Sequence, residues 1–384
     1  MKETLNLPHE LIIQILLRLP VKSLVRFKCV CKLWLSLISD SCFANSHFEL
    51  TAATGEPRIM FTSNFFHESR SIDLATLLDY YSTSLNLDFL HPLSKSDFRI
   101  EMKSSCRGFI FLNCSSSIFS SKIYLWNPST GVHKHIPLPP VVSNKDPDDI
   151  LYLYGFGYDH STDDYLVVSM LCDISKAFSD ISSHLNIFSL RANTWKQIEC
   201  TALLNYSHFP YMDDFFYEER VGFLCNGALH WLACHDYLNE YVIFSFHLIE
   251  REVLEMSFPN DFDHDFNQES MDCDLWVFGE FLSLWAMEYR SLVNIWVMKE
   301  YGLHSSWTKT LVLSIVAIPT RYFYPICCTR NGEIIGTDGG TGLFKYDDKG
   351  QLLEHHSYSN DPDGCQVAVY IESLLSLPSD NEQA

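Results

Sequence analysis

The segment from Asp261 to Asp265 is the part of the chain whose residue types come nearest to a metal site. Its sequence, Asp261-Phe262-Asp263-His264-Asp265, places carboxylate oxygens at alternate positions, as the start of a calcium-binding loop does. That loop needs glycine at its sixth position, where this chain has Phe266, and helices on both sides, where the sequence predicts strands. We therefore interpret the segment as a solvated acidic turn, and we expect no metal.

Other residues have the types found in catalytic sites but lack the spacing. The glycine-rich run at residues 336–342 is not followed by the Gly-Lys-Ser/Thr of a phosphate-binding loop. The acidic pairs Asp163-Asp164 and Asp213-Asp214 are of the kind that glycosidases use, but the sequence sets no distance between them. The short intervals of a zinc site are missing among His230, His235, His264, His355 and His356. We expect a protein that is not an enzyme and carries no cofactor.

A helical region at residues 5–40 precedes a chain that is otherwise rich in strand patterns. Pro8 and Glu10 suit the first turn of a helix, and Pro20 ends the pattern. Apolar residues recur at helical spacing in two groups, which are Leu11, Ile12, Ile15, Leu16 and Leu19, then Leu24, Phe27, Val30, Cys31, Trp34, Leu35 and Ile38. Because so short a segment buries little surface alone, we expect part of it to meet a partner. A small helical core, or a cap on the next domain, is the alternative.

The helical region carries the pattern Leu7-Pro8-x-Glu10-Leu11-Ile12-x-x-Ile15-Leu16-x-x-Leu19-Pro20-x-x-Ser23-Leu24-x-x-Phe27-x-x-Val30-Cys31-x-x-Trp34. This pattern resembles an F-box at nearly every defining position. In that family the helices bind the Skp-type adaptor of a cullin-based ubiquitin ligase. The resemblance implies a three-helix F-box domain at residues 1–45, with adaptor contacts at Leu7, Pro8, Leu11, Ile12, Ile15, Leu16, Leu19, Pro20, Leu24, Phe27, Val30, Cys31 and Trp34.

Past residue 50 the apolar period changes from helical to two, and the pattern repeats. Glycine-containing turns occur at Asn226-Gly227, Gly279-Glu280 and Asn331-Gly332, and their glycines are 52 and 53 positions apart. Strands with an aromatic centre lie between these turns, at Trp126, Phe188, Phe244, Trp296 and Phe344. Two hairpins per unit of about 50 residues make a four-stranded sheet, and such sheets repeated radially form a β-propeller.

We expect an all-β propeller of six blades over residues 46–384, with seven blades or a stacked sandwich as alternatives. Five units can be traced between residues 104 and 356. The segments at residues 57–90 and 366–371 would share a further blade and so join the two ends of the chain. The aromatic centres recur at the structural period, so we interpret them as blade packing rather than as ligand-stacking groups.

Several motifs of this body look like the plant F-box-associated domain, a family that includes F-box/kelch-repeat and S-locus F-box proteins. They cover most of residues 100–320 in the order that family shows, and a plant source is implied. The motifs are Leu125-Trp126-Asn127-Pro128-Ser129-Thr130-Gly131, Tyr154-Gly155-Phe156-Gly157-Tyr158-Asp159, Asn193-Thr194-Trp195-Lys196, Asn226-Gly227-Ala228-Leu229-His230-Trp231, Ile295-Trp296-Val297-Met298-Lys299 and Ser306-Trp307-Thr308-Lys309. The double glycine of a true kelch blade occurs only at Gly339-Gly340, so the kelch likeness lies in architecture.

Composition limits the environment and the partners. The formal net charge of −21 argues against a nucleic-acid ligand, because phosphate binding needs lysine and arginine. Thirteen cysteines without regular spacing do not form a disulfide framework, and no apolar signal segment or membrane-spanning run occurs. We expect a cytoplasmic or nuclear protein that does not enter a membrane.

Taken together, these features predict the substrate-recognition subunit of a cullin-RING (SCF-type) ubiquitin ligase. It would bind the Skp-type adaptor and, through it, cullin and the RING protein, while the propeller holds an unknown target protein. The candidate target contacts lie in acidic and aromatic loops that would suit a basic partner, and they are Phe209, Tyr211, Asp213, Asp214, Phe215, Phe216, Asp261, Asp263 and Asp265. Solvated loops without a partner are the alternative for these residues. For the whole chain, the alternatives are an F-box scaffold outside ubiquitination and a propeller hydrolase.

Overall fold

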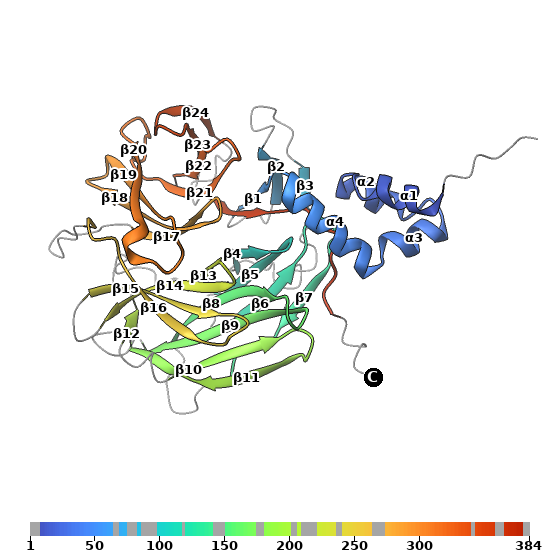
Figure 1. The fold of residues 1–384 in the computed structure, drawn as a ribbon, viewed down its shortest axis with the longest axis horizontal. Helices are drawn as coiled ribbons and strands as arrows, with labels where there is room; N and C mark the ends of the chain where they lie inside the picture. Colours follow the sequence, from blue (N-terminus) through green and yellow to red (C-terminus); the bar gives the residue numbers. More distant parts are fainter. Residues whose placement is uncertain are drawn as a thin grey trace, which may run out of the picture.

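The computed structural model places the helical region beside a body made of strands (Figure 1). It describes residues 8–63, 69–74, 83–85, 98–116, 120–140, 150–173, 180–200, 206–208, 221–235, 240–262, 273–338, 342–357 and 365–378. Within these ranges, no helix combines the length and the apolar character needed to cross a membrane.

The helical region contains four helices, one more than the three expected from the F-box pattern. They are α1 (His9–Leu16), α2 (Val21–Phe27), α3 (Lys32–Ile38) and α4 (Ser41–Thr54). Pro8 stands directly before α1, and Pro20, which the sequence predicts as the end of the first helical pattern, separates α1 from α2. The side chain of Asp40 accepts a hydrogen bond from the Phe43 amide at 3.0 Å and so caps α4. Since α4 runs to Thr54, the expected domain boundary at residue 45 falls inside a helix.

The described strands form five sheets, four of them with four strands each. In strand order, the first is β25 (Cys365–Tyr370), β1 (Arg58–Ser63), β2 (Ser69–Asp73) and β3 (Thr83–Leu85). The second is β4 (Phe98–Cys106), β5 (Phe109–Ser116), β6 (Ser120–Trp126) and β7 (His133–Ile136). The third is β17 (Cys273–Phe278), β18 (Phe281–Glu288), β19 (Leu292–Met298) and β20 (Trp307–Ser314). The fourth is β21 (Tyr324–Cys328), β22 (Ile334–Thr337), β23 (Gly342–Tyr346) and β24 (Leu352–Ser357).

The fifth sheet has nine strands and consists of two antiparallel runs. One run is β8 (Ile150–Asp159), β9 (Asp164–Asp173), β10 (Asp180–Ser189) and β11 (Thr194–Glu199). The other is β13 (Val221–Cys225), β14 (Ala228–His235), β15 (Glu240–His247) and β16 (Val253–Ser257). Two links join the runs, the parallel pairing of β8 with β13 and the short strand β12 (Tyr206–His208), which pairs with β10 and β14.

Close approach of glycines explains the parallel link. Gly155 on β8 pairs with Gly222 on β13, and Trp231 of β14 lies over both. A Cβ built on Gly222 would come within 2.4 Å of the Trp231 ring, and one on Gly155 within 2.8 Å. The Trp231 indole N–H donates to the Tyr154 carbonyl at 2.9 Å. The two runs can therefore touch only because no side chain separates them.

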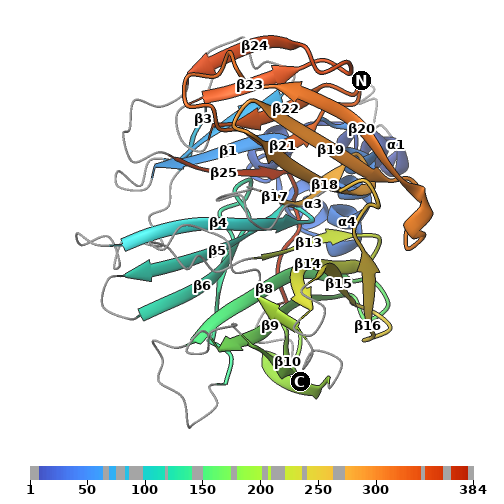
Figure 2. The same ribbon diagram turned by 90° about the vertical axis from the view of Figure 1, so that its left-hand side faces the viewer.

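The first strands of the runs close a ring. β4 contacts β8, β8 contacts β13, β13 contacts β17, β17 contacts β21, β21 contacts β25, and β25 contacts β4. Strand β25 near the end of the chain pairs with β1 near its beginning, in antiparallel register from Arg58–Tyr370 to Ser63–Cys365 (Figure 2). The expectation that the two chain ends share a sheet is confirmed. A closed ring of antiparallel sheets is a β-propeller, not a sandwich.

The predicted turns and aromatic centres also occupy their expected places. Asn226 and Gly227 both have positive φ, at 49° and 74°, as a two-residue hairpin requires. The aromatic centres lie on the third strand of five four-stranded units, where they are at most 3% exposed, and they are Trp126, Phe188, Phe244, Trp296 and Phe344. Their burial fits packing between blades and leaves no face for a ligand.

Candidate docking surface

The inner side of the helical region is packed against itself and against the propeller. Leu16 and Leu24 are 1% and 0% exposed and belong to one apolar cluster with Phe43 and Phe48 of α4 and Phe109 of the propeller. Both leucines were expected to touch an adaptor. In this structure both side chains pack between the helices and the propeller, and their contact with an adaptor stays a prediction.

The outer side of the helical region carries large apolar side chains in contact with solvent. Leu11 and Ile15 lie one turn apart on α1 and are 50% and 51% exposed, and Val30 is 61% exposed. Leu33 and Leu35 on α3 are 54% and 48% exposed. We call these five residues the docking face. Leu11, Ile15 and Val30 were predicted contacts, whereas Leu33 and Leu35 were not.

The remaining predicted contacts lie between these two extremes. Pro8, Pro20 and Cys31 are exposed, and Ile12, Leu19, Phe27 and Trp34 are half-buried. Trp34 packs against Phe27 with ring centroids 5.2 Å apart, so part of each ring remains at the surface. Leu7 lies outside the described residues. Apart from Leu16 and Leu24, the described predicted contacts keep some surface that a partner can reach.

Helix α4 ties the small helices to the body. Its buried face consists of Phe43, Ala44, His47 and Phe48, which recur at helical spacing. His47 is 1% exposed, and its Nε2 lies 2.8 Å from the Leu19 carbonyl, which can only accept a hydrogen bond. The imidazole therefore fastens the turn between α1 and α2 to α4.

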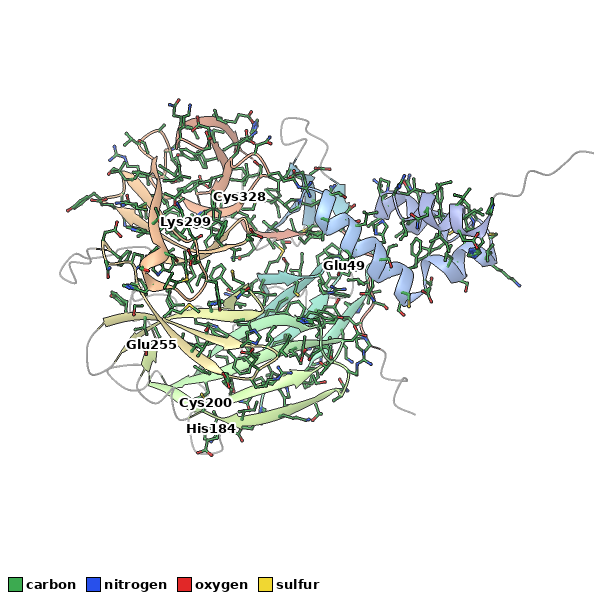
Figure 3. The ribbon with its side chains drawn as sticks, in the orientation of Figure 1. Glu49, His184, Cys200, Glu255, Lys299 and Cys328 are labelled. Atoms are coloured by element: carbon green, nitrogen blue, oxygen red, sulfur yellow. The ribbon has the colours of Figure 1, made fainter. Side chains whose placement is uncertain are left out.

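Two arginines from hairpin turns of the propeller hold α4 near its middle and at its end. Arg107, between β4 and β5, donates to Asn45 at 2.6 Å and, at 2.9 Å, to Glu49, which is labelled on α4 in Figure 3. Its guanidinium also lies over the rings of Phe48 and Tyr158, at 4.8 Å and 4.2 Å from their centroids.

The second arginine, Arg330, follows β21. It donates to the carbonyls of Ala53 and Gly55 at 2.9 Å and 3.0 Å, where the last carbonyls of a helix lack partners. We call Arg107 and Arg330 the arginine bracket. Neither was singled out from the sequence, because their partners lie 58 or more positions away.

The segment after β25 fills the space beneath the helical region. Leu374 and Leu375 belong to the same apolar cluster as Leu16 and Phe48. The side-chain amide of Asn127 donates to the carbonyls of Ser373 and Leu375 at 3.2 Å and 3.1 Å. Gly108, with φ of 81°, leaves room for Ser373, since a Cβ there would come within 2.2 Å of its hydroxyl oxygen. The segment after β25 therefore forms part of the surface against which the small helices pack.

Most candidate target contacts lie outside the described residues, namely Phe209, Tyr211, Asp213, Asp214, Phe215, Phe216, Asp263 and Asp265. Asp261 is described, and its carboxylate accepts a hydrogen bond from the Trp296 indole at 3.0 Å. The candidate residues fall in two segments of the sequence, residues 209–216 and 261–265. The strands that follow these segments in the chain, β13 and β17, begin at Val221 and Cys273, and each begins at the end opposite to its hairpin turn. The corresponding turns of β4 and β21 meet α4, so those strand ends lie on the side of the propeller away from the helical region.

Three of the residues considered for chemistry, His230, Asp163 and Asp164, have structural roles. His230 is fully buried, and its Nδ1 lies 3.1 Å from the Phe223 carbonyl while its Nε2 lies 2.8 Å from the Tyr301 hydroxyl. Burial lowers the pKa of His230 to about 4, so the ring is neutral at physiological pH. Asp164 accepts from the Arg191 amide at 2.9 Å, and Asp163 pairs with the Arg191 guanidinium at 2.8 Å. Across the described ranges, no group of three or more histidine, cysteine or acidic residues could hold a metal ion.

Comparison with known proteins decides the family. The family model of the F-box associated beta propeller domain matches residues 59–374, and that of the F-box domain matches residues 4–45. The chain belongs to the F-box proteins that carry an F-box associated β-propeller. Its N-terminal helices are the F-box region, and the ring of sheets is the propeller.

The relatives come from Arabidopsis thaliana. The F-box/kelch-repeat protein At3g23880 is 28% identical over 385 residues, covering 98% of this chain and 96% of its own length. The F-box protein CPR1 is 29% identical over 321 residues, covering 80% of this chain and 73% of its own length. Among solved structures, TolB from Acinetobacter baumannii has a TM-score of 0.47 at 12% identity over 86% of this chain and 72% of that one, too low to bear on function.

The structure gives a physical reason for the tryptophan motifs of this F-box associated propeller. Trp195 of β11 donates its indole N–H to the Pro137 carbonyl at 2.9 Å, just after β7. Trp307 of β20 donates in the same way to the Ser257 carbonyl at 3.1 Å, at the end of β16. In both cases an outer strand is fastened to the outer strand of the preceding run. Each of these tryptophans therefore links the outer strands of two neighbouring units by a hydrogen bond.

Proposed function

We propose that this F-box protein is the substrate-recognition subunit of an SCF-type cullin-RING ubiquitin ligase. The docking face would bind a Skp-type adaptor and, through it, cullin and the RING protein. The propeller would hold a target protein. The observation that carries the proposal is a helical region that buries one side on the propeller and exposes Leu11, Ile15 and Val30 on the other. The chain itself would catalyse nothing and need no cofactor, since positioning alone raises the effective concentration of target lysines.

The adaptor half of the proposal is tested with the triple variant Leu11→Ala, Ile15→Ala, Val30→Ala. Large apolar anchors at the centre of an interface each cost about 1 to 4 kcal/mol of binding free energy when truncated. We therefore expect the affinity for a purified recombinant Skp-type adaptor, measured by calorimetry, to fall by orders of magnitude. The matched control is Leu254→Ala, Val312→Ala, Leu353→Ala, three exposed apolar residues of the propeller. Equal adaptor affinity of the two triples would contradict the assignment.

For the target, we propose contacts on the side of the propeller away from the helical region. The candidate residues remain Phe209, Tyr211, Asp213, Asp214, Phe215, Phe216, Asp261, Asp263 and Asp265. What supports this side is that turns of the opposite side meet α4 at Arg107 and Arg330 and meet the segment after β25 at Asn127. The test is proximity-labelling mass spectrometry that compares the intact chain with the docking-face triple variant. Targets should be labelled by both and degraded only in cells that carry the intact chain.

We also propose that the propeller has six blades. Four sheets supply one blade each, and the nine-stranded sheet supplies two, because it divides into two antiparallel runs of four strands. The six first strands of these units follow one another around the ring. An experimental structure that placed a further sheet between any two of them would overturn the count.

A scaffold role outside ubiquitination is the rival within the same family, and reconstitution distinguishes the two. The proposal expects the complete complex of adaptor, cullin and RING protein to transfer ubiquitin to a captured target. Complex assembly without transfer would favour the scaffold. The proposal also expects the protein in the cytosol or the nucleus, which imaging of a tagged chain checks.

A further inference from the structure

The helical region carries a net positive charge, although the chain as a whole is acidic. Residues 8–39 hold five lysines and arginines and one acidic residue, Glu10, whereas the whole chain has a formal net charge of −21. Four of the five basic side chains are exposed, and they are Arg18, Lys22, Arg26 and Lys32. The fifth, Lys28, is half-buried, and burial lowers the pKa of its ammonium group.

These basic residues border the docking face. Arg18 follows Ile15 by three positions, in the turn where its amide donates to the Ile15 carbonyl. Arg26 precedes Val30 by four positions, and Lys32 precedes Leu35 by three. Side chains three and four positions apart on helical turns are neighbours. Three of the four exposed cations therefore lie about one turn from an exposed apolar residue.

The four exposed cations are available to another molecule. Among the described residues, no ion pair joins Arg18, Lys22, Arg26 or Lys32 to an acidic side chain. By contrast, Arg58, Arg107, Arg251 and Arg330 of the propeller each pair with a carboxylate. These arginines of the body are engaged internally, whereas the cations of the helical region have no acidic partner among the described residues and lie beside exposed apolar residues, a combination that suits an acidic protein surface.

We infer that the protein surface which receives the docking face has apolar sockets with a rim of aspartate and glutamate. This inference deepens the proposed function and rests on it, since it specifies the chemistry of the adaptor surface. The apolar residues between the cations favour a protein over a nucleic acid, because leucine and isoleucine side chains gain nothing from phosphates. The acidic body would repel such a partner everywhere else, so encounters would be steered to the helices.

The test measures association rates with a purified recombinant Skp-type adaptor as the probe. The α2 pair, Lys22→Glu with Arg26→Glu, reverses two exposed charges on α2. The control pair, Lys196→Glu with Lys299→Glu, reverses two exposed charges on the propeller, with Lys299 lying far from the helices in Figure 3. Both pairs change the net charge equally, and circular dichroism and thermal melting confirm that each is folded.

We expect the association rate constant of the α2 pair to fall about tenfold or more at 50 mM NaCl, whereas the control pair falls less than about twofold. The difference should nearly vanish at 500 mM NaCl, where screening shortens the range of charge interactions to a few ångströms. Equal rates for the two pairs at low salt would overturn the inference. So would binding of a polyuridine oligonucleotide to the wild-type chain at 150 mM NaCl that the α2 pair loses.

The two proposals fail in different ways. If the docking-face triple variant binds the adaptor as well as the wild type, the proposed function fails. If that variant loses binding while the α2 pair associates at the wild-type rate, only the acidic rim is refuted.

Discussion

The helical region and the propeller both contain large apolar residues at regular intervals. The propeller buries these side chains, whereas the helical region exposes part of them to solvent. In the propeller, Phe188, Phe244 and Trp296 recur once per unit and are at most 3% exposed. In the helical region, Leu11, Ile15 and Val30 recur at helical spacing and are at least half exposed. The apolar periodicity therefore accompanies buried packing in the propeller and exposed apolar surface in the helical region.

The difference follows from size and neighbours. Each sheet of the propeller has another sheet on either side, so both of its faces are covered. The short helices α1 to α3 have a neighbour on one side only, where Leu16, Leu24 and Ile38 pack toward α4 and the propeller. Apolar side chains on the other side are in contact with solvent, which is the surface that the proposed function assigns to a second protein.

The largest effect that would separate the two regions is expected from Phe244→Ala. Phe244 is 1% exposed and stacks on Trp231 with ring centroids 5.2 Å apart. Truncating a buried phenylalanine removes its transfer free energy and leaves a cavity, which together cost about 3 to 5 kcal/mol of unfolding free energy. Urea unfolding followed by tryptophan fluorescence measures this loss. Adaptor affinity of the folded fraction should stay at the wild-type value, and a parallel loss of affinity would break the comparison.

A second effect comes from His230 and concerns acid stability of the propeller alone. The pKa of His230 is lowered by burial to about 4 in the folded state, against an ordinary value of 6.5 in the unfolded chain. The unfolded state therefore takes up a proton first, and stability is lost as pH falls from about 6.5 toward 4. The full difference corresponds to about 3 kcal/mol.

The matched variant for this prediction is His230→Gln, which keeps a side chain capable of hydrogen bonding but does not titrate. Its unfolding free energy should be lower than that of the wild type at pH 7 and should decline less between pH 6.5 and 4. The difference in unfolding free energy between the wild type and His230→Gln should therefore become smaller as the pH falls. A pH dependence identical to that of the wild type would show that this imidazole does not control acid stability.

A smaller effect tests how the two regions are joined. Arg107→Ala removes two hydrogen bonds to α4 and the stacking on Phe48 and Tyr158, so we expect α4 to lose about 1 to 3 kcal/mol of local stability. Amide hydrogen exchange of residues 45–54 measures this loss. Lys299→Ala, at an exposed position of the propeller, should leave that exchange unchanged. Exchange that is equally fast in both variants would mean that the bracket does not hold the helix.

The smallest expected effect on stability is that of Ile15→Ala. The side chain is 51% exposed, so its loss should change the unfolding free energy by less than about 0.5 kcal/mol. The same change should weaken adaptor binding by at least about fivefold, because an anchor in an interface core is worth about 1 kcal/mol or more. Thermal melting and calorimetry on one preparation give both values.

The sequence predicts those features of the propeller that depend on residues close together in the chain. An Asn-Gly pair with positive φ at both positions requires a tight turn, and an aromatic residue recurs on the third strand in five four-stranded units. Likewise, strand patterns at both ends of the chain anticipate the pairing of β1 with β25. These features depend on residues within one unit or on its repetition.

The helical region is less predictable, because its structure depends on distant contacts. Helix α1 has apolar residues around most of its circumference, so spacing alone does not say that Leu16 turns inward while Ile15 turns outward. Helix α4 has a low helical propensity at Asn45, Ser46 and Thr51, and its stability comes from the arginine bracket and the apolar cluster beneath it. A pattern within α4 cannot predict contacts with arginines that are 58 or more positions away in the sequence.

We propose that another protein covers the exposed side of the helical region. Hydrogen–deuterium exchange with and without a purified Skp-type adaptor tests it directly on the wild-type chain. We expect exchange to slow throughout residues 9–38 on adding the adaptor, and to stay unchanged in the buried strands β14, β15, β18 and β19. Unchanged exchange in α1, α2 and α3 at saturating adaptor would contradict the account.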